Sequence, residues 1–342
     1  MLMTRVWVRR TLAGVPKSRQ KGMGAEVFPP FDPEAAEVVL EPEAPGQGYW
    51  VGAPSVLRHK GQVLLTYRRR RPRGVDPDRG YRSCIAVSAD GLHFEDVSAL
   101  DKEALGTTSI ERTALLPDPA GGGWIWLVSY VDPADGRWRT DALRAGRLED
   151  LPRGERTPVL TAADIGGEGV KDPVVVRTAE GIHLILSCAE RSRSAADASA
   201  MHSTNDAYNT GLVNCFTGLA ATRDGKHWEW RGRCMDTGAG WDRYQARIGA
   251  VVPVGPVWVG LYDGSAGVEE NYEERLGVAV STDLARWRSV TPDGPAVLSR
   301  GRTGSVRYAD VLPADDGLWV YFECSRPDGA HDLRRARLAW KP

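Results

Sequence analysis

The sequence predicts an all-β protein, a five-bladed β-propeller, because one segment type recurs five times. The five copies begin with GAPSVL, ERTALL, KDPVVV, RIGAVV and RYADVL, and each continues through a turn into a second apolar run. When Pro54, Thr113, Pro173, Gly249 and Ala309 are taken as equivalent, the spacings between copies are 59, 60, 76 and 60 residues. A period of this length, made of short strands and turns, is typical of propeller blades.

The second half of three repeats supports this architecture. The segments SADGLHF, TRDGKHW and STDLARW each place an Asp two residues, and an aromatic residue six residues, after a Ser or Thr. Sialidases carry similar boxes, which would give them a functional meaning. We instead predict turns in which the carboxylate and the hydroxyl accept backbone N–H groups, while the aromatic ring packs between blades.

Composition and charge exclude several classes of function. The formal net charge of the 342 residues is -1, so we expect no nucleic-acid partner and no binding to an anionic membrane. No apolar run approaches the roughly 20 residues that span a bilayer. The start MLMTRVWVRRTLAGVPKSRQ lacks the apolar core of about 7–15 residues that a signal peptide needs, so we expect a cytoplasmic protein.

Cysteine and histidine spacing gives no sign of a metal or cofactor site. The five Cys contain no CxxC pair, and the six His show no ligand spacing. We therefore expect reduced thiols, no metal and no cofactor.

The repeat divides the chain into two parts. Residues 41–342 form the predicted propeller, and residues 1–40 lie before it as an extension with a basic start. We expect this extension to wrap the propeller or to contact a neighbouring subunit of a homo-oligomer. A strand at Thr4–Val8 would add to an outer blade, whereas closure of the ring without an N-terminal strand is equally compatible with the sequence.

Strand topology predicts which face carries the site. The longest connections, Arg68–Arg82, Ala189–Asn214 and Gly264–Arg275, fall on the face where the innermost strand of each blade begins. The second of them accounts for the spacing of 76 residues and is a candidate lid over the channel mouth. The run Arg68–Arg71 is predicted either to bind phosphate or to belong to a solvated loop.

Charged residues recur at the start of the innermost strands. One repeat position holds Gly52, Glu111, Lys171, Arg247 and Arg307, and the next holds Ala53, Arg112, Asp172, Ile248 and Tyr308. Since buried charges are costly unless they are paired or used, we interpret these rows as a funnel for an anion or a sugar. The alternative is a ring of structural salt bridges between neighbouring blades.

Two repeats resemble a known enzyme family. GAPSVLRHKGQVLLTYRRR with IAVSADGLHFE looks like the first blade of the mannoside phosphorylases (glycoside hydrolase family 130), and WDRYQARIGAVVPVGPVWVGLYDG with YEERLGVAVSTDL is similar to their fourth. KDPVVV resembles the Asp-Pro strand of the wider five-bladed group that includes arabinanases and invertases. The resemblance implies a glycoside substrate, a phosphate- or substrate-binding role for Arg68 and a phosphate-binding role for Lys171.

The chain departs from these family patterns at key positions. The mannoside phosphorylases have Glu-Asp-Pro-Arg with a proton-donating Asp, where this chain has Glu111 followed by Arg112. Their Tyr-His-Gly is here Tyr262-Asp263-Gly264, which loses a phosphate-binding His. Of the arabinanase-like carboxylates, Asp172 is the one retained.

These observations predict a glycoside hydrolase-like enzyme that cleaves a small or oligomeric saccharide, by hydrolysis rather than phosphorolysis. Two carboxyl groups are the usual requirement, and we assign them to Asp172 and Glu111. The predicted substrate-binding residues are Arg68, Arg112, Lys171, Trp241, Arg247, Asp263, Arg307 and Tyr308. The alternatives are a repurposed propeller that binds a sugar or an anionic metabolite without turnover, and a protein-interaction propeller.

Overall fold

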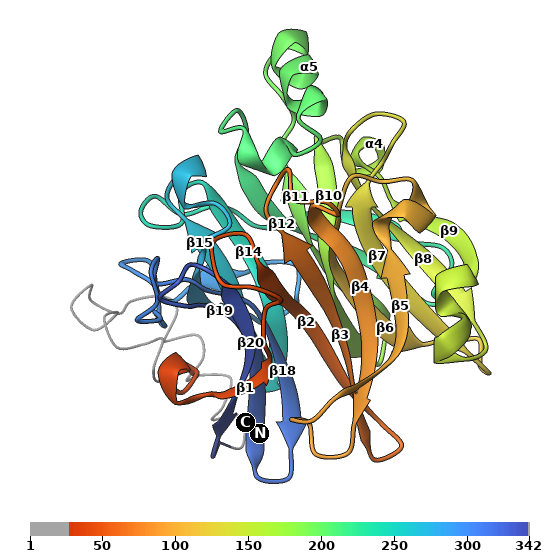
Figure 1. Cartoon of the computed structure of the whole chain (residues 1–342), viewed down its shortest axis with the longest axis vertical. Coiled ribbons are helices and arrows are strands. Elements are labelled where there is room, and N and C mark those ends of the chain that lie inside the picture. Colours follow the sequence, from red (N-terminus) through yellow and green to blue (C-terminus); the bar gives the residue numbers. More distant parts are fainter. Residues whose placement is uncertain (1–26, 341–342) are drawn as a thin grey trace.

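The computed structural model describes residues 27–340, and strands dominate it (Figure 1). The predicted all-β class is confirmed. The helices of this part of the chain are η1 (Pro33–Ala35), η2 (Lys102–Leu105), η3 (Leu148–Arg153), α4 (Ala162–Ile165), α5 (Ala195–Ser203), η4 (Ala207–Asn209) and η5 (Val268–Glu270). None of them is both long enough and apolar enough to cross a membrane.

Strand pairing follows the sequence repeat, because each copy forms an antiparallel unit. Unit 1 contains β2 (Trp50–His59), β3 (Gln62–Arg71), β4 (Arg79–Ser88) and β5 (Glu95–Asp101). Unit 2 contains β6 (Ile110–Pro117), β7 (Trp124–Val131), β8 (Trp138–Ala145) and β9 (Glu155–Leu160). Unit 3 contains β10 (Gly169–Thr178), β11 (Gly181–Ala189), β12 (Cys215–Thr222) and β13 (Glu229–Met235).

The remaining strands form the last two units. Unit 4 contains β14 (Gln245–Val254), β15 (Val257–Ser265), β16 (Arg275–Ser281) and β17 (Arg288–Ser289), and unit 5 contains β18 (Val306–Ala314), β19 (Gly317–Ser325) and β20 (His331–Leu338). Single parallel bridges join some units, so that the hydrogen bonds define one sheet of eight strands and one of twelve. The hydrogen-bonded sheets do not close on each other.

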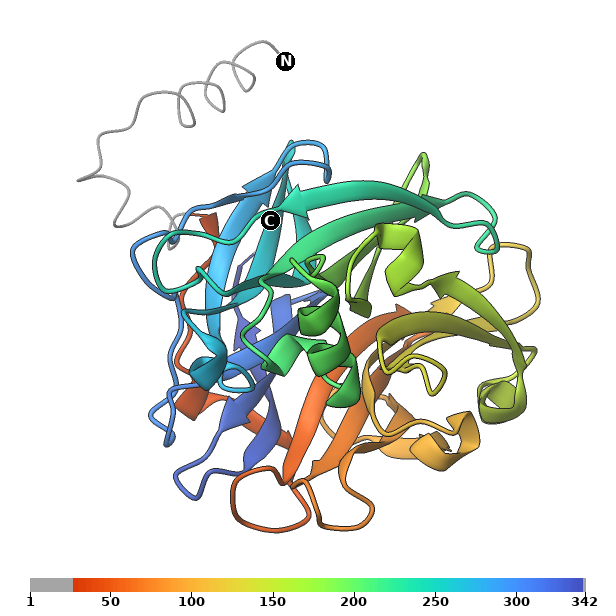
Figure 2. The ribbon, with the colours of Figure 1, turned by 90° about the horizontal axis from the view of Figure 1, so that it is seen from above.

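The first strands of the units meet around the middle of the molecule. Strands β2, β6, β10, β14 and β18 contact one another in cyclic order, as the view from above shows (Figure 2). Each has a register shift within a residue of the same repeat position, which lies between Gly52 and Ser55 in β2 and between Arg307 and Asp310 in β18. A bulge changes where successive side chains point. Adjacent repeat rows can therefore both reach the centre, which regular alternation would prevent.

The core lies between the units, where aromatic and aliphatic side chains interlock. Phe94 of unit 1 packs edge-on against Tyr321 of unit 5, with ring centroids 6.3 Å apart. The turn interpretation of the Asp boxes is confirmed in unit 1. There the Asp90 carboxylate accepts the backbone N–H groups of Leu92 and His93, both at 2.9 Å.

The last part of the predicted extension takes part in a sheet. Residues Glu37–Leu40 form β1, which pairs antiparallel with β20 at the outer edge of unit 5. Just before it, Phe28 joins the core beside unit 5, and the ring of Phe31 lies 5.2 Å from that of Phe322. The strand predicted at Thr4–Val8 lies outside the described residues, and the subunit contact stays a prediction.

Shortening a core side chain tests this packing. Phe322 is 0% exposed, so Phe322→Ala should lower the free energy of unfolding by about 3–5 kcal/mol through lost burial and a cavity. Leu298, which is 50% exposed, provides the matched control. Leu298→Ala should change the free energy of unfolding by less than about 0.5 kcal/mol. Urea unfolding measures both values, and equal effects would contradict the packing described here.

Candidate active site

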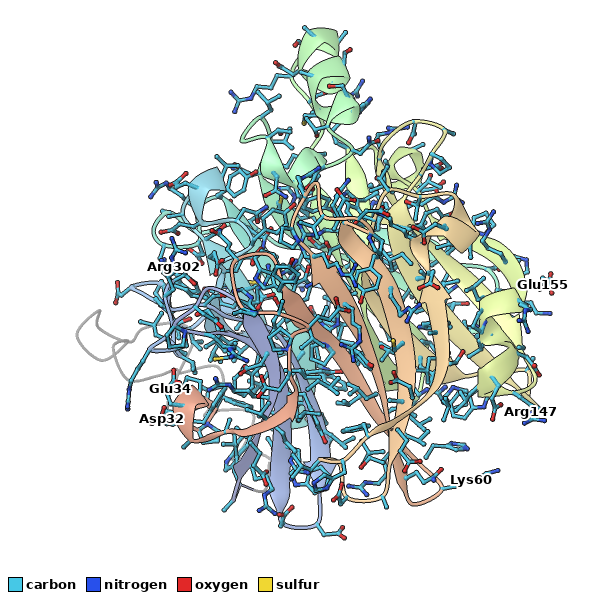
Figure 3. The ribbon with its side chains drawn as sticks, viewed as in Figure 1. Asp32, Glu34, Lys60, Arg147, Glu155 and Arg302 are labelled. Atoms are coloured by element: carbon cyan, nitrogen blue, oxygen red, sulfur yellow. The ribbon has the colours of Figure 1, made fainter. Side chains whose placement is uncertain are left out.

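A cluster of charged side chains is buried where the innermost strands begin. Glu111, Lys171, Arg247 and Arg307 are all 5% exposed or less. Charged residues at the periphery, such as Lys60, are exposed to solvent (Figure 3). Burial of this many charges requires that they neutralise one another or serve a ligand.

Arg68 joins three units at the centre. Its guanidinium, which β3 carries, pairs with the Glu111 carboxylate of unit 2 and, at 3.0 Å, with the Glu323 carboxylate of unit 5. Glu323 fills the space beside Gly52, where a Cβ atom would lie 2.3 Å from the Glu323 Oε2 atom. Only glycine therefore fits at this copy of the charged repeat position.

Two further arginines connect the other units. The Arg247 guanidinium of unit 4 pairs with the Asp172 carboxylate of unit 3 at 2.9 Å and with Asp263 of its own unit at 2.6 Å. Arg307 of unit 5 pairs with Glu274 of unit 4 at 2.8 Å. The ion pairs of the salt-bridge interpretation are therefore present between neighbouring units.

Tyr308 lies among these pairs. Its hydroxyl donates a hydrogen bond to Glu111 at 3.2 Å, and the Arg247 guanidinium lies 3.9 Å from its ring centroid. Its backbone N–H donates to the carboxylate of Asp263 at 3.0 Å. Tyr308 has a φ of 52° and Asp172, at the same repeat position, has a φ of 59°. Such left-handed backbone in residues other than glycine is strained and is often found at functional sites.

Lys171 faces the same region from β10. Its ammonium lies 3.6 Å from the Asp172 carboxylate, with the ring centroids of Trp138 and Tyr208 at 4.7 and 4.6 Å. The two aromatic rings and the carboxylate hold the cation at the centre of the molecule. Glu111, Asp172, Arg68, Lys171, Arg247, Asp263, Arg307 and Tyr308 are thus brought together as the sequence predicts.

Arg112 lies beside this group but in contacts between strands. Its Nη1 atom donates to the carbonyl of Gly249 at 2.6 Å, and its Nη2 atom lies 3.5 Å from the carboxylate of Asp310. Its backbone N–H donates to Asp172 at 3.2 Å, while Asp310 accepts the backbone N–H of Val56 at 2.8 Å. These contacts link the innermost strands of all the units.

Trp241, also predicted to bind substrate, is not brought to the cluster. Its indole N–H donates to the carbonyl of Thr291 at 2.8 Å, and its ring packs against Tyr262 with centroids 5.4 Å apart. It lies at the edge of an apolar cluster formed by units 3 and 4. The structure therefore gives Trp241 a packing position.

Burial and neighbouring charges shift the pKa values of two carboxyl groups of the cluster in opposite directions. Burial alone would raise the pKa of Glu111, but Arg68, Lys171 and Arg70 hold it below its usual range. Burial raises the pKa of Asp263 although Arg247 opposes the change. Carboxyl groups whose pKa values are driven apart are a known basis for acid–base catalysis.

Four members of the cluster were not among the predicted site residues, and Glu323, described above, is one of them. Arg70 is 5% exposed and pairs with Glu111 at 3.2 Å, so neither it nor Arg68 lies in a solvated loop. Its position two residues after Arg68 on one strand was the available signal. Glu274 pairs with Arg307, and His331 pairs with Glu323 at 2.8 Å. Both stand next to strand starts on the face of the site.

The predicted lid lies over this cluster. Residues 190–214 connect β11 to β12, contain α5 and η4, and lie across the middle of the molecule in Figure 2. The Tyr208 hydroxyl of this segment donates to the carbonyls of Gly169 at 3.0 Å and Ser187 at 2.8 Å. The Asp206 carboxylate pairs with Arg73 at 2.9 Å. We call residues 190–214 the lid.

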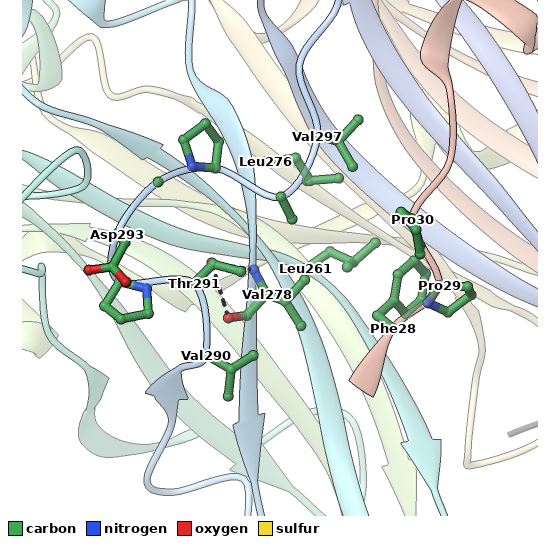
Figure 4. Close-up of a pocket in the computed structure, with 14 residues that line it drawn as sticks. Phe28, Pro29, Pro30, Leu261, Leu276, Val278, Val290, Thr291, Asp293 and Val297 are labelled. Carbon is green, nitrogen blue, oxygen red and sulfur yellow. Dashed lines mark hydrogen bonds between the residues drawn. The ribbon is translucent and has the colours of Figure 1, made fainter. Parts of the chain in front are cut away.

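A separate apolar pocket lies away from the cluster. It has a volume of about 360 Å³ and is lined by Phe28, Leu261, Leu276 and Val290 among other residues, at the outer part of unit 4 (Figure 4). Within residues 27–340, no group of three or more His, Cys, Asp or Glu side chains is arranged to hold a metal ion. The charged cluster is therefore the candidate site.

Comparison of the structure with solved ones identifies the fold. A protein titled "Glycoside hydrolase" superposes with a TM-score of 0.68 at 13% identity, over 96% of this chain and 97% of that one. A thermostable family-43 glycoside hydrolase gives 0.63 at 14% identity, covering 89% and 93%. The β-1,2-mannobiose phosphorylase from Listeria innocua gives 0.55 at 15% identity, covering 91% and 95%.

No protein-family model and no curated protein matches the sequence. The structural likeness shows that the chain shares the fold of these solved proteins, which agrees with the fold that the sequence resemblance implies. Because folds host many functions, the activity has to be argued from the site.

Removal of the Arg112 side chain tests its role between the strands. Arg112→Met leaves the Asp310 carboxylate and the Gly249 carbonyl without their buried partner. We expect it to lower the free energy of unfolding by about 3–5 kcal/mol. The matched change Arg147→Met, at an exposed arginine, should leave the urea midpoint unchanged. Similar midpoints for the two variants would show that Arg112 does not hold the strands together.

The buried His331 predicts a pH dependence of stability. Hydrogen bonds to Glu273 and Glu323 raise its pKa above 6.5, although burial and the nearby Arg307 oppose this. The protonated form therefore stabilises the fold below about pH 6.5, and this contribution is lost as the pH rises through the folded-state pKa.

The difference in unfolding free energy between wild type and His331→Gln should be largest at low pH and shrink as the pH rises. Urea unfolding between pH 5 and 9 measures it, with the exposed His227→Gln as control. A difference that grows with pH would reverse the sign argued here.

Proposed function

We propose that the protein is a five-bladed β-propeller enzyme that cleaves a glycosidic bond beneath the lid. The five repeats and the cyclic contacts of the innermost strands support this blade count. One observation carries the function. Two carboxylates from neighbouring units, Glu111 and Asp172, are buried at adjacent positions around the centre of a fold shared with glycoside hydrolases.

The chemistry follows from the surroundings of this pair. Glycoside cleavage generally uses one carboxyl group as acid and another as base or nucleophile. Glu111, which its cations keep ionised, suits the base or nucleophile. Asp172, from the neighbouring unit, would supply the second carboxyl group that the reaction requires. Arg68, Lys171 and Arg307 would bind hydroxyl or anionic groups of the saccharide.

Asp263 favours hydrolysis over phosphorolysis. Its carboxylate is held against Arg247 and the backbone N–H of Tyr308, within the cluster. A carboxylate at this place uses the donors that a phosphate would need, and in its ionised form it repels the phosphate. Water therefore suits the site better than phosphate as the attacking group.

A second candidate function is binding without turnover. The carboxylates of Glu111, Asp172, Asp263, Glu274 and Glu323 are each paired with an arginine. Such complete pairing favours a rigid recognition surface for a sugar or an anionic metabolite.

A turnover screen separates these functions. Wild type is assayed on aryl glycosides and on short mannosides, arabinosides and glucosides, with and without phosphate. We expect phosphate-independent cleavage that Asp172→Asn and Glu111→Gln each reduce about 10²–10⁴-fold, because each removes a proton-transfer or nucleophilic group. Asp135→Asn, at a surface ion pair, is the matched control.

Each other result has a defined meaning. Cleavage only with phosphate would establish phosphorolysis despite Asp263. Unchanged turnover in Asp172→Asn would exclude the proposed pair, and the absence of cleavage with sugar binding intact would favour the second candidate.

A further inference from the structure

The lid inserts a carboxylate into a site built from side chains of the body. Asp206 is 2% exposed, and its carboxylate accepts hydrogen bonds from Arg73 Nη2 at 2.9 Å and from the Tyr272 hydroxyl. The Nη2 atom of Arg79 lies 3.6 Å from this carboxylate as a charge partner and donates its hydrogen bond to the backbone carbonyl of Asn205 at 2.8 Å. Within the lid, the Asn209 amide also donates to it at 2.9 Å. We call Arg73, Arg79 and Tyr272 the latch site.

Positive charge at the latch site exceeds what Asp206 neutralises. Arg70 adjoins it, because its guanidinium lies 4.5 Å from the ring centroid of Tyr272. The Nε atoms of Arg70 and Arg79 are buried and have no hydrogen-bond partner within residues 27–340. Burial lowers the pKa of Arg79 even though Asp206 is close. Buried donors without a partner are costly, so the site has unused capacity for an oxygen ligand.

Backbone strain is concentrated around the same carboxylate. Arg79 has a φ of 57°, Tyr272 a φ of 76°, and Asn205, the residue before Asp206, a φ of 52°. Strained residues of this kind persist where a ligand clamp or a switch requires them. The body side of the Asp206 contact is therefore strained at Arg79 and Tyr272, whereas Asn205 is a residue type that accepts this backbone conformation.

The latch site adjoins the candidate catalytic carboxylate. Arg70 Nη1 pairs with the Glu111 Oε1 atom at 3.2 Å while its guanidinium stacks on Tyr272. A group that replaced the Asp206 carboxylate would thus be attached to a sugar lying next to Glu111. Glu111 is 2% exposed, so a saccharide reaches it only after its surroundings rearrange, and the lid is the inserted segment on this face.

We propose that Asp206 holds the place of a substrate carboxylate, and that a saccharide containing a uronic acid displaces it from Arg73 and Arg79 and thereby opens the lid. This inference rests on the proposed function and names its substrate class. A neutral sugar has no charge with which to replace Asp206 at paired guanidinium groups, whereas a carboxylate matches their geometry. The lid therefore selects acidic saccharides by competition.

The test measures binding and lid opening without turnover. Galacturonate and galactose, which differ in the carboxylate, are titrated into the full-length protein by calorimetry, and hydrogen exchange is followed in residues 195–209. We expect binding of galacturonate alone, with faster exchange of the lid. Asp206→Asn removes the competing charge, so galacturonate should bind about ten- to a hundredfold more tightly and the free lid should exchange faster.

Variants of the two arginines of the latch site test the same binding. Arg73→Ala, at a side chain 51% exposed, should fold normally and bind galacturonate about tenfold more weakly. Arg79→Met should abolish binding, and the Arg73 variant keeps the test valid if Arg79→Met does not fold. Asp135→Asn is the control for Asp206→Asn and should leave binding unchanged.

Equal binding of galacturonate and galactose, no binding of either, or no effect of Asp206→Asn would overturn the inference. Lid opening by inorganic phosphate to the same degree would show a general oxyanion site and would also overturn it. Galacturonate binding in a protein that cleaves no glycoside would support the latch and refute the proposed function. Cleavage of neutral glycosides without galacturonate binding would support the proposed function and refute the latch.

Discussion

The structure depends on neutralising the charges that meet at its centre. Arg112 is 1% exposed, and its guanidinium and backbone N–H connect β6 to β10, β14 and β18, while Asp310 extends the connection to β2. An unpaired charge at such a place would cost several kcal/mol. The innermost strands are therefore held in one arrangement by polar contacts, and the apolar packing lies between the units, farther from the centre.

This arrangement makes the fold and the candidate site a single system. The ion pairs that join neighbouring units also fix the charge state of Glu111 and the position of Asp172. The bulges at the strand starts bring consecutive residues to the same region, at the cost of left-handed backbone at Asp172 and Tyr308. A change in one arginine consequently alters both the stability of the ring of strands and the chemistry at its centre.

The repeat and the long loops made much of this predictable. The repeat rows located Lys171, Arg247 and Arg307 at the centre, since equivalent strands must begin on one face. The ion-pair and hydrogen-bond partners of each charged residue were not predictable, because they depend on how far each side chain extends and in which direction. Both Arg112 and Trp241 were predicted to bind substrate. The structure instead places the Arg112 side chain in contacts between strands and Trp241 in a packed position at the edge of an apolar cluster. Glu274 and Asp206 were not predicted as site residues, because they lie in loops, where the sequence repeat gives no equivalent positions to compare.

The way the lid joins the body bears on how such proteins diversify. Ala189 and Cys215, which border the lid, are paired partners on adjacent strands. The intervening segment can therefore be lengthened, shortened or replaced while the strand register on either side stays the same. Selection can remodel ligand preference through this one insertion without disturbing the central charges, and an engineer can exchange it as a cassette.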